Sequence, residues 1–151
     1  MRIGIIGTGE LSGSLAEWWT QAGHDVVIGS EQPADTGAAT LGDAAAFGEA
    51  VLFAPDWAAA HSVLDATAGA LAGKPVLDAT NPVVRGDRGY QRAVPDDLSG
   101  IETLAGWAPD AHWVKALNTV PPSVLRRRRA RWPWPGRRWP AAPPRGPSRP
   151  A

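Results

Sequence analysis

A glycine-rich turn near the start of the chain restricts the possible folds more than any other feature. Gly7 and Gly9 follow an apolar run at 3–6 and precede a segment, 11–22, whose apolar residues recur at helical spacing. The apolar run predicts a strand buried on both faces, and the spacing predicts an amphipathic helix. A second buried strand is predicted at 25–28. Strand, glycine turn, helix and strand within about 30 residues form a βαβ unit.

Short apolar runs alternate with helical segments up to about residue 120. Runs at 50–54, 76–79 and 112–117 predict three further strands. Ser99 and Glu102 have the spacing of a capping box, which predicts a short helix before the last of these strands. Strands that alternate with helices build parallel sheets with helices on both faces. We therefore predict an α/β fold, a Rossmann-type parallel sheet with helices on both faces that is incomplete at its C-terminus.

Three segments have less regular patterns. Residues 30–40 are rich in Gly, Pro, Asp and Thr, so we expect the strand near 38–41 to be rudimentary or missing, with no room for a helix before it. Asp56 is predicted to cap a helix that runs to about residue 71. Residues 83–97 contain Gly, Pro and charged residues and are predicted to form a loop.

The glycine turn is typical of a dinucleotide site. Gly7 allows the tight turn, Gly9 leaves space for a pyrophosphate, and the helix N-terminus offers N–H groups and a partial positive charge to that anion. Ser12 replaces the third glycine of G-x-G-x-x-G and is small enough for close packing of the helix on the strand. The alternative is a structural turn without a ligand. The place of the turn, directly after an N-terminal apolar strand, favours the cofactor site.

The end of the second strand indicates which dinucleotide binds. An acid there accepts a hydrogen bond from the ribose 2′-hydroxyl of NAD, whereas a basic residue accommodates the 2′-phosphate of NADP. Ser30 could donate to a phosphate, but Glu31 would repel it and favours NAD. No Lys or Arg occurs between Arg2 and Lys74. The alternative for Glu31 is a solvated surface acid.

Several segments, in the same order, resemble the NADP-dependent oxidoreductases that act with the deazaflavin coenzyme F420. These proteins are also similar to the N-terminal part of pyrroline-5-carboxylate reductase. The matching segments are MRIGIIGTG (1–9), AGHDVVIGS (22–30), AAAFG (44–48), LFAP (52–55), GK (73–74), DATNP (78–82), SGIETLA (99–105) and VKALNT (114–119). The DATNP and VKALNT segments are the most specific.

The resemblance implies direct hydride transfer between nicotinamide C4 and a stacked deazaflavin ring. That chemistry requires positioning more than acid–base groups, so no catalytic residue and no metal site are assigned. By this likeness Thr8, Gly9, Leu11 and Ser30 would contact the phosphates and ribose. The residues that would line the nicotinamide end are Ala54, Pro55, Asn81, Pro82 and Asn118. The full set of expected cofactor-binding residues is Gly7, Thr8, Gly9, Glu10, Leu11, Ser12, Ser30, Glu31, Ala54, Pro55, Asn81, Pro82 and Asn118.

The sequence departs from the family pattern in ways that leave two functions open. The family usually has Arg after the serine that ends the second strand, where this chain has Glu31, and the resemblance stops near residue 125. The first function is hydride transfer between NADPH, or NADH because of Glu31, and coenzyme F420. A ferric or small imine acceptor is the alternative substrate, and a homodimer could complete the acceptor site. The second function is a catalytically inactive, C-terminally truncated remnant that still binds dinucleotide.

Charge divides the chain into two parts. Residues 1–125 contain six basic and fifteen acidic residues, whereas residues 126–151 contain nine Arg, seven Pro and no acid. We therefore expect an NAD(P)-binding domain at 1–125 and a disordered tail at 126–151. Arg interleaved with Trp could bind nucleic acid. The tail uses only residue types with G- and C-rich codons, however, which favours a frameshifted reading frame over nucleic-acid binding.

Two further features concern the cellular setting. The chain has no cysteine, which excludes disulfides and thiolate metal sites. No run of about 18 apolar residues is present, so we expect no membrane-spanning segment. We expect a cytoplasmic protein.

Overall fold

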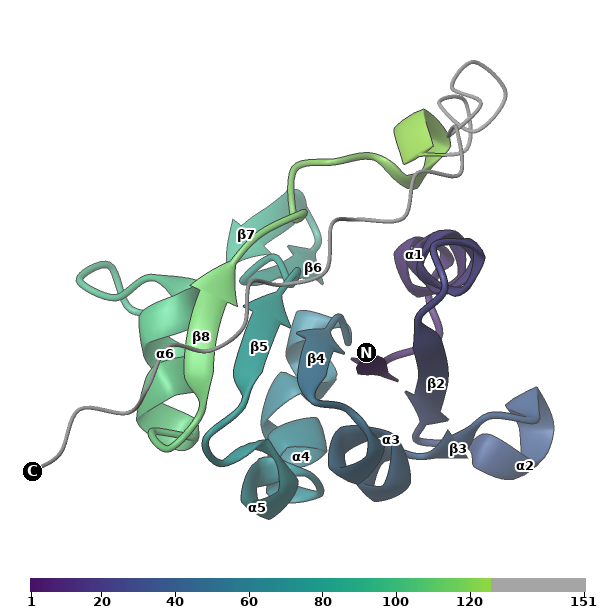
Figure 1. Ribbon diagram of the computed structural model, residues 1–151. Helices are drawn as coiled ribbons and strands as arrows, with labels where there is room; N and C mark the ends of the chain where they lie inside the picture. The colour runs from purple at the N-terminus through teal and green to yellow at the C-terminus, as the bar shows by residue number, and fades with distance from the viewer. Residues whose placement is uncertain (126–151) are drawn as a thin grey trace, which may run out of the picture.

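Six parallel strands form the central sheet in the computed structural model, which describes residues 1–125 (Figure 1). The order across the sheet is β3-β2-β1-β4-β5-β8. This is the Rossmann order, in which the chain starts in the middle and moves outward in both directions, so the strand order reverses between β1 and β4. The prediction of a Rossmann-type parallel sheet is confirmed. The strands are β1 (Arg2–Ile6), β2 (Asp25–Ser30), β3 (Ala39–Thr40), β4 (Ala50–Phe53), β5 (Pro75–Asp78) and β8 (His112–Lys115).

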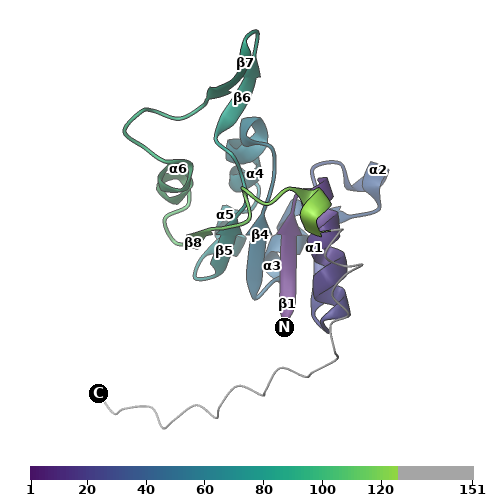
Figure 2. The same cartoon turned by 90° about the horizontal axis from the view of Figure 1, so that it is seen from above.

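Helices cover both faces of the sheet (Figure 2). Helix α1 (Glu10–Gln21) packs on one face with Leu15 buried, and Leu125 is buried in the same apolar cluster. The other face has the larger core, in which Ile6, Phe53 and Val76 of the strands meet the helices. The helices on this second face are α3 (Leu41–Phe47), α4 (Ala60–Asp65), α5 (Ala68–Leu71) and α6 (Gly100–Trp107).

Two hydroxyl groups cap helices that support the sheet. The Thr40 hydroxyl accepts a hydrogen bond from the backbone N–H of Asp43, at 3.1 Å, at the start of α3. Ser99 and Glu102 form the predicted capping box at the start of α6. The Ser99 backbone N–H donates to Glu102 Oε2 at 2.7 Å, and Ser99 Oγ accepts from the Glu102 N–H at 3.3 Å. Each cap satisfies N–H groups that a helix cannot pair within itself.

The connection from β2 to β3 is short, as its composition predicts. Strand β3 has two residues and pairs only with the end of β2, so the prediction of a rudimentary strand is confirmed. We expected no helix before this strand. That expectation was wrong, because the one-turn helix α2 (Pro33–Thr36) lies there. Pro33 fixes the backbone angle at the first helical position, and Gly37 ends the turn in the left-handed conformation, with φ of 67°.

The long helix predicted after Asp56 is broken into three pieces. A 3₁₀ turn, η1 (Trp57–Ala59), precedes α4, and α5 follows a break at residues 66–67. The Thr67 hydroxyl donates to the Val63 carbonyl oxygen at 2.8 Å, and this local bond competes with helix continuation. Asp56 occupies the N-cap position, but its side chain makes no capping hydrogen bond, so the predicted cap was wrong.

A β-hairpin replaces the loop predicted at 83–97. Strands β6 (Val83–Gly86) and β7 (Gly89–Arg92) pair antiparallel around Asp87 and Arg88, and the hairpin projects from the domain (Figures 1 and 2). The Arg92 guanidinium anchors its base by donating to the carbonyl oxygens of Pro95, at 2.8 Å, and Leu98, at 2.6 Å. The hairpin follows the carboxyl end of β5 and contacts η1.

Two predictions concern membrane spans and the tail. Within residues 1–125 no helix is long and apolar enough to cross a membrane. The expectation of a disordered tail at 126–151 lies outside the described residues.

Candidate dinucleotide site

The glycine turn links β1 to α1 at the carboxyl edge of the sheet. Gly7 has φ of 110°, and its N–H donates to the Gly29 carbonyl oxygen at 3.0 Å, which ties the turn to the end of β2. A Cβ at position 7 would lie 2.6 Å from the Ala54 carbonyl oxygen, so only glycine fits. Gly9 caps α1 without any side-chain hydrogen bond, and a Cβ there would meet no atom within 4 Å. The space beside Gly9, at the start of α1, is therefore open.

A cleft of about 380 Å³ lies beside this turn, at the carboxyl ends of β1, β2 and β4. Its apolar wall includes Leu41, Ala59 and Val63. Its remaining lining is mainly polar or backbone. The complete lining is Ile6, Gly7, Thr8, Gly9, Ser30, Glu31, Gln32, Thr36, Leu41, Ala54, Pro55, Asp56, Ala59 and Val63. A volume of this size suits a small-molecule ligand or part of a larger one.

The structure brings together about half of the residues expected from the sequence. Those in the cleft are Gly7, Thr8, Gly9, Ser30, Glu31, Ala54 and Pro55. Those outside its lining are Glu10, Leu11, Ser12, Asn81, Pro82 and Asn118. Ser12 is fully buried, and its hydroxyl has no hydrogen-bond partner among residues 1–125. This placement matches the close packing of α1 on the sheet that a small residue permits.

Asn81 and Asn118 form a second group, after β5 and β8. Asn118 Nδ2 donates to Asn81 Oδ1, and Asn81 Nδ2 donates to the Asn118 carbonyl oxygen, each at 3.2 Å. The preceding residue, Leu117, has φ of 69° and is the one non-glycine residue within 1–125 with a positive φ. Such a backbone conformation is costly and occurs often at functional sites. The strained turn brings two exposed amides together at the ligand edge of the sheet.

A partly buried ion pair joins the ends of β5 and β8, the two strands that these amides follow. Lys115 Nζ donates to Asp78 Oδ2 at 2.8 Å and also to the Thr80 carbonyl oxygen. Asp78 Oδ1 accepts from both the backbone N–H and the hydroxyl of Thr80, at 2.8 and 2.6 Å. The Asp78 side chain is fully buried, and that of Lys115 is 29% exposed. The pair fixes the turn from which Asn81 projects.

Sequence reasoning missed several residues of the cleft and of the region around Asn81 and Asn118. Gln32, Thr36 and Asp56 line the cleft, but no motif marks them because turns bring them there from outside the glycine pattern. Lys115 was known only as part of a family segment. Its partner is 37 residues away in sequence, and only the register of β5 against β8, which pairs Asp78 with Lys115, reveals the contact.

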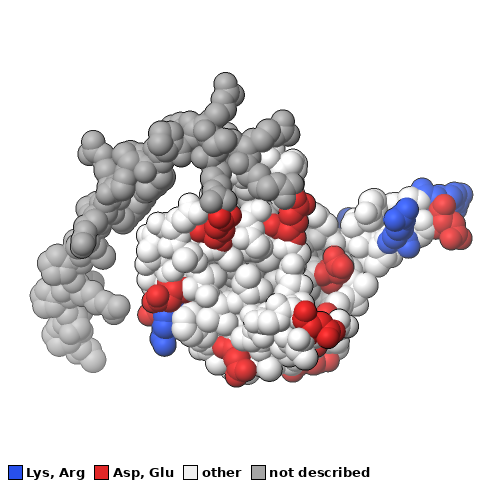
Figure 3. Space-filling view, turned by 90° about the vertical axis from the view of Figure 1, so that its right-hand side faces the viewer, with Lys and Arg blue, Asp and Glu red and all other residues white. Residues whose placement is uncertain are grey.

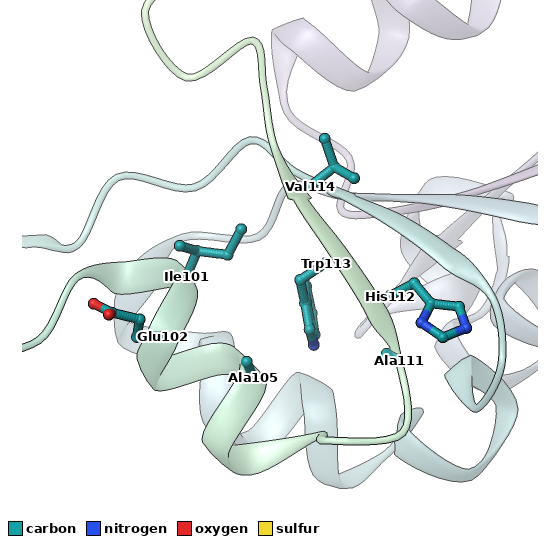
Figure 4. A pocket seen from close by; sticks show the side chains of 7 residues that line it. All are labelled: Ile101, Glu102, Ala105, Ala111, His112, Trp113 and Val114. Carbon is teal, nitrogen blue, oxygen red and sulfur yellow. The ribbon is translucent and has the colours of Figure 1, made fainter.

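A second hollow lies between α6 and the outer edge of β8 (Figure 4). Trp113 stands between the helix and the strand, and its Nε1 donates to the Ala108 carbonyl oxygen at 3.0 Å. Ile101, Ala105 and Val114 give this hollow an apolar character. It lies away from the carboxyl ends of the strands, where parallel sheets bind ligands, so we do not assign the site to it.

The charges around the cleft are one-sided. Residues 3–73 contain nine acidic residues and no Lys or Arg. The space-filling view shows acidic groups spread over the body, whereas most of the basic groups in view lie on a projecting part (Figure 3). Among residues 1–125 no three His, Cys, Asp or Glu side chains gather as a metal site would require.

The cleft as a whole suits a dinucleotide. It combines a glycine turn open to solvent, a helix N-terminus and an apolar wall with a polar rim.

The sequence profile of the family described as "NADP oxidoreductase coenzyme F420-dependent" matches residues 2–82. The chain belongs to this family. The matched segment contains the glycine turn, every residue that lines the cleft, and Asn81. The family includes oxidoreductases that use NADP, and the resemblance found in the sequence segments is therefore confirmed.

Individual proteins agree with this assignment. A candidate F420-dependent NADP-reductase from Arthrobacter sp. FB24 superposes with a TM-score of 0.77 at 29% identity, over 82% of this chain and 65% of that one. Hypothetical protein SMa0349 from Sinorhizobium meliloti gives 0.62 at 26% identity, over 83% and 64%. Metalloreductase STEAP3 of Rattus norvegicus is 31% identical over 126 residues, which are 79% of this chain and 25% of that protein. The chain thus spans less than two thirds of each of these proteins.

Proposed function

We propose that this member of the family transfers a hydride between a nicotinamide dinucleotide and the deazaflavin coenzyme F420. The observation that carries the proposal is the cleft at the carboxyl edge, which joins the glycine turn to the end of β2. The family description and the name of the Arthrobacter structure support F420 as the partner coenzyme.

The adenosine half of the cofactor would occupy the cleft, with its base against Leu41, Ala59 and Val63 and its ribose near Ser30. The pyrophosphate would lie over Gly9, where the N–H groups of the first turn of α1 and the helix dipole attract anions. This arrangement uses the open space at Gly9, where a side chain would meet no protein atom but would meet the phosphates.

The nicotinamide end would extend past Ala54 and Pro55 toward the Asn81–Asn118 amide pair. The bound dinucleotide supplies a hydride at nicotinamide C4, and the two amides would hold the ring in one orientation for that transfer. Lys115 and Asp78 would hold the amides in place through the turn at Thr80. The deazaflavin would take up one proton along with the hydride; solvent can supply it, so no side chain is assigned as an acid or a base.

A second acceptor is supported by one comparison. The 31% identity to a protein named a metalloreductase covers 79% of this chain and favours a metal-ion acceptor. With a ferric acceptor, two Fe³⁺ ions would be reduced to Fe²⁺ for each hydride that the dinucleotide gives up. The acceptor's binding surface would also need residues beyond the cleft, which a second copy of the chain could supply. A chain that binds dinucleotide without turning it over is the remaining alternative.

Turnover measurements separate these functions. The purified full chain is mixed with NADH or NADPH and either oxidised F420 or a ferric chelate, and loss of the reduced nicotinamide is followed. Oxidation coupled to loss of oxidised F420 supports the proposal, and oxidation with the ferric chelate alone replaces F420 with a ferric acceptor. Dinucleotide binding without oxidation in either mixture contradicts the enzymatic proposal and leaves a binding protein.

A further inference from the structure

The segment that follows β2 lines the edge of the cleft and places Glu31 there. The Ser30 hydroxyl accepts a hydrogen bond from the Gln32 N–H at 3.0 Å, which turns the chain at the end of the strand. The Thr36 hydroxyl donates to the Gln32 carbonyl oxygen at 3.1 Å, so α2 is tied to the same turn. Ser30 is buried, Glu31 is exposed, and both line the cleft. These hydrogen bonds hold the backbone on both sides of Glu31, whose exposed side chain is part of the cleft lining.

No cation within residues 1–125 lines this cleft, whereas Glu31 and Asp56 both do. The basic residues that bracket the acidic segment lie elsewhere. Arg2 begins β1 and Lys74 directly precedes β5, so both are at the amino edge of the sheet, opposite the cleft. Lys74 Nζ donates to the Ala45 and Ala46 carbonyl oxygens at 2.8 and 3.2 Å. Neither side chain reaches a ligand at the carboxyl edge.

The two dinucleotides differ only at the adenosine ribose. NADP carries a 2′-phosphate there, an anion for which proteins normally supply Arg or Lys, whereas NAD carries a hydroxyl that donates to a carboxylate. In this cleft a 2′-phosphate would face the Glu31 carboxylate with no compensating cation from the lining. A 2′-hydroxyl would find an acceptor at Glu31.

We propose that this chain selects NAD(H) over NADP(H), and that Glu31 is the residue that determines the choice. The inference rests on the proposed function, because it assumes that the cleft binds a nicotinamide dinucleotide. It departs from the NADP named in the family description, and it does so through a residue in this chain's own cleft rather than through the family's shared glycine turn.

The test compares the dissociation constants of NADH and NADPH, measured by calorimetry on the full chain. Three variants are included: Glu31→Gln removes the charge, Glu31→Arg reverses it, and Asp25→Arg is the control. Asp25 starts the strand that Glu31 follows, so the control makes the same charge change at the opposite edge of the sheet. Circular dichroism confirms that each variant is folded.

The wild type should bind NADH about tenfold or more tightly than NADPH, since a charge repulsion of roughly 1.4 kcal/mol corresponds to that factor. Glu31→Gln should narrow the ratio, Glu31→Arg should reverse it, and Asp25→Arg should leave it within about twofold. Equal or tighter binding of NADPH by the wild type, or an unchanged ratio in Glu31→Arg, would overturn the inference while leaving the proposed function intact. Failure of the folded wild type to bind either dinucleotide would overturn both.

Discussion

Lys115 Nζ lies 2.8 Å from Asp78 Oδ2. This ion pair joins the carboxyl ends of β5 and β8, the last two strands on one side of the sheet. The Asp78 side chain is fully buried, and it contacts the Lys115 ammonium and accepts two hydrogen bonds from Thr80. Through Thr80, the residue before Asn81, the pair connects the stability of the domain to the geometry of the proposed nicotinamide end.

We expect Lys115→Met to lower the free energy of unfolding by about 2 to 3 kcal/mol, because it leaves a buried carboxylate without its counter-charge. The measurement is urea unfolding followed by circular dichroism. Lys74→Met is the matched control. Within residues 1–125 this lysine donates to carbonyl oxygens and to no carboxylate, so its removal leaves no buried charge without a partner and should cost less than Lys115→Met.

Adding Asp78→Asn to Lys115→Met should recover part of this loss, since the double variant has no uncompensated buried charge. If Lys115→Met and Lys74→Met lowered the stability equally, the ion pair would not have the role given to it here.

Asn118→Ala should reduce the rate of nicotinamide oxidation at saturating dinucleotide, with little change in the dinucleotide dissociation constant. The physical reason is that the amide pair would orient the reacting ring, whereas most binding contacts lie in the cleft. Thr119→Ala, the exposed neighbour, should keep the wild-type rate. Steady-state rates and calorimetry together provide the check. A rate unchanged in Asn118→Ala would remove the amide pair from the site.

The capping box of α6 should make stability depend on pH. The Ser99 hydroxyl, and after it the Ser99 backbone N–H, hold the pKa of Glu102 below its ordinary value. A carboxyl whose pKa is lower in the folded state stabilises the fold above its unfolded pKa. That contribution is lost as pH falls through the folded pKa. The stability difference between the wild type and Ser99→Ala should therefore narrow as pH falls from about 6 to about 3.

Thr103→Ala is the control for this effect. The Thr103 hydroxyl donates to the Ser99 carbonyl oxygen at 3.0 Å, in the same helix turn. Its removal should change stability by an amount independent of pH, because its partner does not titrate. A constant difference for Ser99→Ala across the same pH range would contradict the role assigned to Glu102.

Gly7→Ala should destabilise the domain strongly. Position 7 has φ of 110°, and a Cβ would lie 2.6 Å from the Ala54 carbonyl oxygen. Strain and overlap together should cost about 3 kcal/mol. Thermal unfolding measures the loss, and a melting temperature equal to that of the wild type would show that the turn differs from the one described.

Local patterns predicted the parts of this fold that depend on local physics. The glycine turn and apolar spacing of the first thirty residues predicted β1, α1 and β2, and the Ser99–Glu102 spacing predicted the capping box. The hairpin at Val83–Arg92 was missed because its exposed strands have no alternation of apolar and polar residues. The helix break at Thr67 was missed because the apolar spacing continues across it. The Thr67 hydroxyl competes with a backbone hydrogen bond of the helix, and this competition does not change the apolar spacing.

The site was predictable to the same extent. Gly7 and Gly9 follow β1, and Ser30 and Glu31 stand at the end of β2, so the sequence could place them at one edge of the sheet. Gln32 and Lys115 depend on the path of α2 and on the register of β5 against β8, which are properties of the tertiary structure.

The central claim is that the cleft beside Gly9 binds a nicotinamide dinucleotide, and Gly9→Ala tests it most directly. A methyl group at this position meets no protein atom within 4 Å. Because Ala is a poorer N-cap than Gly, the variant should lose about 1 kcal/mol of stability and still fold, which circular dichroism checks. The same methyl group would occupy the space proposed for the pyrophosphate. Calorimetric titration of both full chains with NADH should show saturable binding to the wild type and affinity lower by about tenfold or more in the variant. Equal affinity of the two proteins, or no binding by the folded wild type, would contradict the account.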